Sequence, residues 1–196
     1  MTDLKKIAED LGIKYDVVCE VGVWKPEESH ILNLIPHAKK VLMFEAQEEY
    51  AEQSRVAFKE YDYVTVHTVA IYNEDLDSVQ FVDIGSSSFI EGTISPSVNM
   101  HVYNIPERER FHVKARTFDN YDEGDIDILT VDVEGVEWYV LDKMKSRPKL
   151  ICLETHYDPI GYINPFMKEI EMWLQKNGYV EHIKDVSDTI YRKITS

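Results

Sequence analysis

The sequence predicts an α/β fold built on a doubly wound, mostly parallel sheet. Short apolar runs of strand length alternate with segments of helical periodicity, which favours parallel strands joined by helices over a sandwich or a bundle. The stretch at residues 125–141 contains such a run, followed by two carboxylates and a glycine. This order is typical of a buried strand that reaches a ligand-binding sheet edge. With 196 residues, 44% of them hydrophobic, the chain fits a single domain over residues 1–196.

The expected elements begin with an amphipathic leading helix at residues 3–11, because Leu4, Ile7 and Leu11 recur on one face ahead of Gly12. Buried apolar runs then predict five strands, at residues 16–21, 41–45, 64–71, 126–133 and 150–154. Helices are expected between them at residues 26–35, 47–60 and 136–145.

The last part of the chain predicts one more helix and an antiparallel pair of strands. Asn164 and Pro165 supply an N-cap and a first-turn proline, and Asn177 and Gly178 end the helix. The segments 179–183 and 189–194 flank a polar turn, as in a closing antiparallel pair.

A long irregular loop is expected at residues 84–110, which contain glycines, serines and prolines with little periodicity. Loops of this length either cover a functional site or form a solvated insertion, and length alone does not decide between the two.

The charge of the chain narrows the range of partners. Thirty-six acidic and 21 basic residues give a formal net charge of −15, which repels nucleic acids and anionic membranes. The apolar runs are too short for a membrane span, and the first residues form no apolar signal region. We therefore expect a cytoplasmic protein that binds a small molecule, with no nucleic acid partner and no membrane span. Cys19 and Cys152 lack metal-type spacing and are expected to be reduced core residues.

A first candidate binding motif is Gly22, which ends a predicted strand before a helix and so permits close approach of a nucleotide-type ligand to the backbone. Such turns are also common without a ligand. Glu27 and Glu28 would repel a pyrophosphate at the start of that helix, and there is no GxGxxG or Walker motif. Both observations argue against NAD and ATP.

Glu45 ends the second predicted strand, 23 residues after Gly22, where an acidic residue can accept hydrogen bonds from both ribose hydroxyls. The alternative is a helix cap or a solvated charge. An adenosyl ligand without pyrophosphate fits both the absence of a phosphate motif and the position of Glu45.

Four ionisable residues lie at or just beyond the carboxyl ends of two neighbouring predicted strands: Asp132, Glu134, Glu154 and His156. Parallel strands would bring them to one sheet edge, where Asp132, Glu134 and His156 are candidates for acid–base catalysis. Asp132, Glu154 and His156 are also candidate ligands for Mg²⁺ or Mn²⁺. The alternative is that Glu154 and His156 only cap loops. The other histidines, His30 among them, show no ligand spacing.

These motifs together resemble the FkbM-type class I S-adenosylmethionine-dependent methyltransferases over most of the chain. The matching pieces, in order, are Glu20-Val-Gly22, Phe44-Glu45-Ala46, Val69-Ala-Ile71, the serines of residues 85–88, Arg116-Thr-Phe-Asp119, the segment 130–135 with Glu137 and Leu141, and Ile151-Cys-Leu-Glu154. The resemblance implies a Rossmann-like sheet with an antiparallel last strand and methyl transfer to an oxygen, commonly of a sugar or related metabolite.

The resemblance also implies a cofactor site. Contacts with S-adenosylmethionine are expected at Glu20, Gly22, Glu45 and Ala46, with adenine near Ala70 and Ile71, while Asp132 and Glu134 face cofactor and acceptor. One departure is in the glycine loop, where Trp24 takes the place of an asparagine and Pro26 that of a second glycine. Trp24 is expected to offer a face to the sulfonium or the adenine, or else to pack on the helix.

Three hypotheses follow from these observations. The first is an S-adenosylmethionine-dependent O-methyltransferase that acts on a carbohydrate-like small molecule. The second is a non-catalytic binding or assembly module with an altered cofactor loop. The third is a metal-dependent hydrolase that uses the carboxylates of the fourth and fifth strands and has no need of Glu45.

Overall fold

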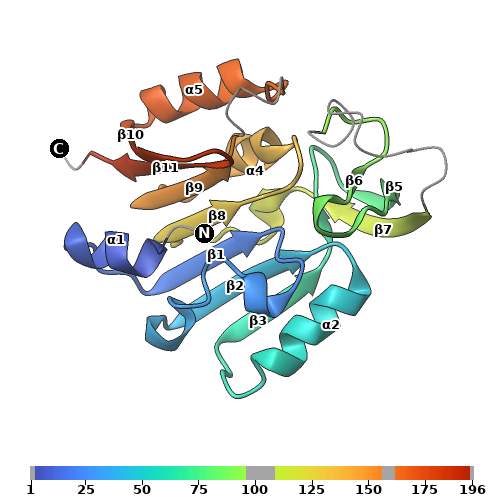
Figure 1. Cartoon of the computed structure of the whole chain (residues 1–196), viewed down its shortest axis with the longest axis horizontal. Coiled ribbons are helices and arrows are strands. Elements are labelled where there is room, and N and C mark those ends of the chain that lie inside the picture. Colours follow the sequence, from blue (N-terminus) through green and yellow to red (C-terminus); the bar gives the residue numbers. More distant parts are fainter. Residues whose placement is uncertain (1–2, 96–108, 156–161, 195–196) are drawn as a thin grey trace.

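The computed structural model describes residues 3–95, 109–155 and 162–194 and contains two sheets (Figure 1). The strands of the larger sheet are β1 (Val17–Val21), β2 (Lys40–Glu45), β3 (Val64–Thr68), β8 (Ile128–Val131), β9 (Leu150–Glu154), β10 (Tyr179–Lys184) and β11 (Asp188–Lys193). Their order is β10-β11-β9-β8-β1-β2-β3, and the strands from β9 to β3 pair in parallel. β11 runs antiparallel to β9. The predicted doubly wound sheet with an antiparallel last strand is confirmed.

A hydrophobic core lies on each face of the larger sheet, because side chains alternate between the faces along each strand. Cys19, Val21 and Leu129 point to the face that is covered by α4 (Glu137–Lys143) and α5 (Met167–Lys176). Val18 and Cys152 point to the other face, which is covered by α1 (Leu4–Asp10) and by residues 31–35. α2 (Glu48–Ala57) packs along β2 and β3.

The helix predicted at residues 26–35 is wrong. Two short 3-10 turns, η1 (Pro26–Glu28) and η2 (Ile35–His37), stand in its place. The backbone N–H of His30 and the hydroxyl of Ser29 both donate to the buried Glu20 carboxylate, so the chain leaves helical geometry there. Pro36 also disfavours helical geometry in the residue before it.

The predicted strand at residues 64–71 is divided between the two sheets. β3 ends at Thr68, and β4 (Ala70–Ile71) joins the smaller sheet, which also contains β5 (Leu76–Val82), β6 (Phe89–Ile90) and β7 (Arg110–Arg116). Its order is β4-β7-β5-β6, and it lies beside the larger sheet (Figure 1). The backbone N–H of Val69 donates to the Glu45 carbonyl, which ties the crossing point to the end of β2.

The irregular loop expected at residues 84–110 is therefore wrong in part. It contains a 3-10 turn, η3 (Gly85–Ser87), and β6, and β7 begins at its last residue. The segment 96–108 lies outside the described residues. β5 and β7 form because alternate side chains, such as Phe81, Phe111 and Val113, pack in a small core between them.

The C-terminal elements follow the predictions closely. α5 begins at Met167 rather than directly after Asn164, and the Asn164 side chain accepts a hydrogen bond from Phe166 N at 2.9 Å. Asn164 thus caps the turn that leads into the helix. β10 and β11 form the expected antiparallel pair.

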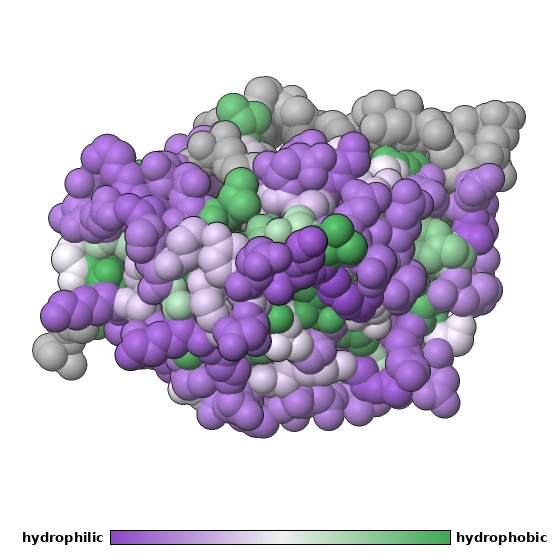
Figure 2. All heavy atoms as spheres, turned by 90° about the horizontal axis from the view of Figure 1, so that it is seen from below, coloured by the Kyte–Doolittle hydropathy of each residue, from purple (hydrophilic) through white to green (hydrophobic). Residues whose placement is uncertain are grey.

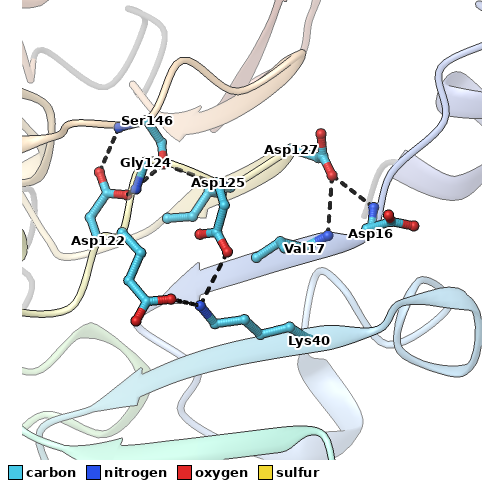
Figure 3. A network of polar contacts seen from close by, with 10 residues as sticks. Asp16, Val17, Lys40, Asp122, Gly124, Asp125, Asp127 and Ser146 are labelled. Carbon is cyan, nitrogen blue, oxygen red and sulfur yellow. Dashed lines mark hydrogen bonds and ion pairs between the residues drawn. The ribbon is translucent and has the colours of Figure 1, made fainter.

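A network of carboxylates holds the amino ends of the central strands together (Figure 3). Asp127 accepts hydrogen bonds from the backbone N–H groups of Asp16 and Val17, at 2.7 and 3.2 Å. Lys40 pairs with Asp125 at 3.2 Å. These acidic residues join β1, β2 and β8, so their role is structural and distinct from that of the carboxylates at the opposite edge.

The surface agrees with the acidic composition. The face shown in Figure 2 is mostly hydrophilic, with apolar side chains gathered in small patches. Among the described residues no helix is long and apolar enough to cross a membrane.

Candidate active site

A cavity opens at the carboxyl edge of the larger sheet and extends to β5, η3 and β6 of the smaller one. Eight of the candidate site residues line it: Gly22, Trp24, Glu45, Ala46, Ala70, Ile71, Asp132 and Glu134. The strand register places Glu45, Gly22, Asp132 and Glu154 side by side along the edge, one on or directly after each of β2, β1, β8 and β9. Neighbouring strands are about 4.8 Å apart, so Glu45 and Asp132 lie about 10 Å from each other along this edge.

Gly22 is required by the backbone at the end of β1. Its φ of +88° lies in the left-handed region, and a Cβ atom there would stand 1.8 Å from the carbonyl oxygen of Asp132. Its N–H donates to the Phe44 carbonyl at 2.9 Å. Gly22 thus lets β1, β2 and β8 end together at the floor of the cavity.

Trp24 holds a left-handed conformation with φ +51°, which is uncommon for a residue other than glycine. Its N–H donates to Glu45 at 2.8 Å, and its ring meets Tyr50 of α2 edge-on at 6.0 Å. The indole therefore both packs on the helix and lines the cavity. Within the described residues its buried Nε1 has no hydrogen-bond partner, so a donor is left for an acceptor outside the chain.

Glu45 is almost fully buried, and its two carboxylate oxygens accept from Trp24 N and from Gln47 N, the latter at 2.7 Å. Burial raises the pKa of this carboxyl, and the backbone N–H groups oppose that rise. The backbone N–H groups of Ala46 and Val23 also act on this carboxylate. Glu45 thus fixes the glycine loop and also lines the cavity as a hydrogen-bond acceptor.

Glu20, which was expected to contact the cofactor, does not line the cavity. Its carboxylate accepts from the Ser29 hydroxyl at 2.5 Å and from His30 N at 2.7 Å. Burial raises the pKa of Glu20 to about 7. Glu20 therefore anchors the segment after η1 to the sheet.

The remaining wall of the cavity is apolar where the chain crosses between the sheets. Val69, Ala70 and Ile71 line it together with Phe81 and Ile90. A flat, largely apolar ring such as a nucleobase suits such a wall. The strands that carry Phe81 and Ile90 were not expected from the sequence.

Asp132, Glu134 and Glu154 form a cluster in which one carboxylate oxygen of each residue lies within 4.8 Å of the others. Burial, and then the charge of Asp132, raises the pKa of Glu134 to about 8. Burial and the same neighbours raise the pKa of Glu154 well above its ordinary value. The cluster therefore retains protons at neutral pH, because like charges this close in a buried site do not all ionise.

Glu137, a buried residue of α4, fixes the turn that carries Glu134. It accepts from Gly135 N at 2.9 Å and bonds to the Asn164 amide, and burial raises its pKa to about 7. Val133 N also donates to Glu137, at 3.4 Å. Glu134, between Val133 and Gly135, has φ +56°, so a strained turn that Glu137 holds on both sides carries its side chain.

The structure bears differently on two histidines, His156 and His30. His156 lies outside the described residues. His30, to which the sequence gave no role, lines the cavity next to the segment that Glu20 anchors. No motif in the sequence indicated His30, because its position depends on the tertiary hydrogen bond from its backbone N–H to Glu20.

The comparisons with known proteins fit this geometry. A family model described as the methyltransferase FkbM domain matches residues 16–181. The chain belongs to the FkbM methyltransferase family. It is therefore an S-adenosylmethionine-dependent methyltransferase, and the enzyme hypothesis prevails over the non-catalytic module and the hydrolase.

Solved structures show the same fold at low sequence identity. A candidate rRNA methylase from Clostridium thermocellum has a TM-score of 0.53 and 8% identity, with 100% of this chain and 97% of that one covered. A candidate RNA methyltransferase from Pyrococcus horikoshii has a TM-score of 0.51 and 12% identity, with coverage of 97% and 81%. No curated protein sequence matches the chain.

The cavity residues fit S-adenosylmethionine. Glu45 lines the cavity with a carboxylate that accepts hydrogen bonds, the buried Trp24 Nε1–H has no partner among the described residues, and the wall at residues 69–71 is apolar. When bound, this cofactor supplies an electrophilic methyl group on a sulfonium.

Proposed function

We propose that this methyltransferase acts on a hydroxyl group of a sugar or related small metabolite. The observation that carries the proposal is the cluster of Asp132, Glu134 and Glu154 beside the cofactor cavity. Carboxylates accept hydrogen bonds from several hydroxyls at once, as carbohydrate recognition requires. The same carboxylates, in a chain of net charge −15, would repel the phosphates of an RNA acceptor.

We assign the cofactor roles residue by residue. Glu45 would hold the ribose, Ala46, Ala70 and Ile71 would enclose the adenine, and Gly22 and Trp24 would shape the turn next to the methionine part. Because Glu45 and Asp132 are two strand spacings apart, a cofactor whose ribose lies at Glu45 extends toward Asp132. Glu20 would act indirectly, since it anchors the segment that carries His30.

The acceptor hydroxyl must lose a proton during transfer, and we propose that the carboxylate cluster receives it. Asp132 and Glu134 line the cavity, and Glu134 has a pKa of about 8, close to the value that suits a general base at neutral pH. Asp132 would orient the hydroxyl, and Glu134 or Asp132 would take its proton. His156 keeps its proposed role as an alternative base.

We propose a second role for the cluster, as a site for Mg²⁺ or Mn²⁺, which prefer oxygen ligands. Asp132 and Glu154 were expected as ligands, and Glu134 lies with them. Loss of activity with a chelator and its recovery with Mg²⁺ would support this role. Activity that survives the chelator would leave the cluster as base alone.

We take residues 1–196 as one methyltransferase domain, because both sheets contribute walls to one cavity. We place the protein in the cytoplasm, because Cys19 and Cys152 are free thiols, as is common in a reducing compartment.

The test is transfer of a radiolabelled methyl group from S-adenosylmethionine to a panel of sugars, sugar nucleotides and RNA oligonucleotides. We expect label on a sugar-type acceptor, with mass spectrometry locating it on oxygen. Asp132→Asn should lower the rate of labelling about 100-fold or more, whereas Asp142→Asn, on the surface of α4, should retain it. Label on RNA alone would overturn the proposed acceptor.

A further inference from the structure

A second group of potential ligands lies on the sheet near the carboxylate cluster. The side chains of His30, Cys152 and Asp188 each place one ligand atom within 4.8 Å of the others. They come from three separate segments, namely the turn after η1, strand β9 and the first residue of β11. Spacing in the sequence therefore gave no sign of them, and Cys152 was expected to be only a core residue.

The register of the strands explains how these residues meet. Cys152 pairs with Thr130 in β8, and Asp188 pairs with Glu154 in β9. Residues two apart on a strand share a face, so Cys152 and Glu154 point to the same side of the sheet. His30 is held over that side because its backbone N–H donates to Glu20 at 2.7 Å.

The three residues are held in place by contacts outside the group. Asp188 begins its strand after a turn in which its N–H donates to Asp185 at 2.8 Å. Cys152 is 4% exposed and Asp188 8% exposed. A site that is buried and fixed by several elements loses little conformational freedom when it takes a ligand.

An unsatisfied polar atom stands next to this group. Within the part of the chain that the structure describes, the hydroxyl of Thr130 is buried and has no hydrogen-bond partner. It lies beside Cys152 across the β8–β9 pair and on the same face. A buried hydroxyl without a partner commonly marks a missing water or ion.

We propose that His30, Cys152 and Asp188 bind a zinc ion. A thiolate, an imidazole and a carboxylate are a ligand set that zinc accepts, whereas Mg²⁺ avoids sulfur. Tetrahedral zinc with these ligands places their atoms about 3.5 Å apart. The three ligand atoms now lie within 4.8 Å of one another, so side-chain movements of about 1 Å would bring them to the separation that zinc requires. A water in the fourth position would lie within reach of the Thr130 hydroxyl.

The proposed ion would fasten the turn after η1 to strands β9 and β11. His30 also lines the cofactor cavity, so the ion would stabilise one of its walls. This site is separate from the oxygen-only cluster of Asp132, Glu134 and Glu154 and does not depend on the proposed acceptor.

The test is a titration of the full chain with Co²⁺ after treatment with a chelator and desalting. We expect one equivalent to bind, with visible absorption typical of tetrahedral cobalt and a thiolate-to-cobalt charge-transfer band in the near ultraviolet. Added Zn²⁺ should displace the cobalt and remove both signals. A wild-type protein that binds no Co²⁺, or binds it without the charge-transfer band, would overturn the proposal whatever the variants show.

The two cysteines give a matched pair of variants. Cys152→Ser should remove the charge-transfer band and weaken binding by more than about 100-fold, since a direct ligand is lost. Cys19→Ser alters an equally buried thiol on the opposite face of the sheet and should keep the wild-type spectrum. Asp132→Asn should also keep the band. A spectrum that Asp132→Asn abolishes and Cys152→Ser preserves would assign the metal to the carboxylate cluster instead.

Discussion

Replacing Glu20 with glutamine should flatten the pH dependence of this protein's stability. Glu20 is fully buried, and burial raises the pKa of its carboxyl from 4.5 to about 7 in the folded state. The folded protein therefore holds this proton more tightly than the unfolded chain does. The stabilisation is fully present below pH 4.5 and is lost as the pH rises through about 7.

The magnitude follows from the two pKa values. A shift of one unit corresponds to about 1.4 kcal/mol, so between pH 5 and pH 8 Glu20 should remove about 2 to 3 kcal/mol from the free energy of unfolding. In Glu20→Gln the amide oxygen can accept from His30 N, and the amide nitrogen can donate to the Ser29 hydroxyl. The variant keeps the contacts of the neutral acid and has no proton to lose.

The assay is urea denaturation at several pH values and constant salt, with the free energy of unfolding extrapolated to water. The wild type should lose about 2 to 3 kcal/mol more than Glu20→Gln between pH 5 and pH 8. Glu60→Gln removes an exposed carboxylate in the same way and should follow the wild type. If Glu20→Gln shows the same pH slope as the wild type, Glu20 is not a buried acid with a raised pKa, and our account of this anchor is wrong.

Three further predictions concern the cavity. Gly22→Ala should abolish binding of S-adenosylhomocysteine and lower the melting temperature, because its Cβ would stand 1.8 Å from the Asp132 carbonyl oxygen. Gly12→Ala, with open space around its Cβ, should retain binding. Equal affinities of the two variants for S-adenosylhomocysteine would contradict this prediction. Asp132→Asn should lower turnover about 100-fold or more with the fold intact, as judged by circular dichroism; wild-type turnover would exclude a catalytic role. The turnover of the wild type should rise with pH around 8, where Glu134 loses its proton. Glu134→Gln should not show that rise. An unchanged pH profile in the variant would exclude Glu134 as the general base.

The sequence predicted the larger sheet well, because its strands are buried on both faces and read as continuous apolar runs. It also predicted the cavity residues at the strand ends, since Gly22, Glu45 and Asp132 each follow such a run directly. The point at which an apolar run ends can be read from the local sequence. Residues that end neighbouring strands must meet at one edge.

The smaller sheet was missed although part of its signal was present. Phe111, Val113 and Ala115 alternate with polar residues in β7, but the glycines and serines around residue 85 suggested a loop. The pairing of β5 with β7 brings together segments that are far apart in sequence, and no local pattern specifies that contact.

The failed helix at residues 26–35 has a different cause. Its composition permits a helix, but Glu20 takes the hydroxyl of Ser29 and the N–H of His30 in the folded protein. The tertiary contact overrides the local preference. The position of His30 near Cys152 and Asp188 depends on that same contact, so it too could not be predicted from spacing.

Calorimetric titration with S-adenosylhomocysteine tests the central claim most directly, namely that the cavity beside Gly22 and Glu45 holds the adenosyl cofactor. The wild type should bind one equivalent. Glu45→Gln should weaken binding about 10- to 100-fold, because a charged acceptor with two backbone partners is lost, and Glu49→Gln, on the exposed surface of α2, should bind like the wild type. A wild-type protein that binds no S-adenosylhomocysteine, or a Glu45→Gln variant that binds it with unchanged affinity, would contradict the account.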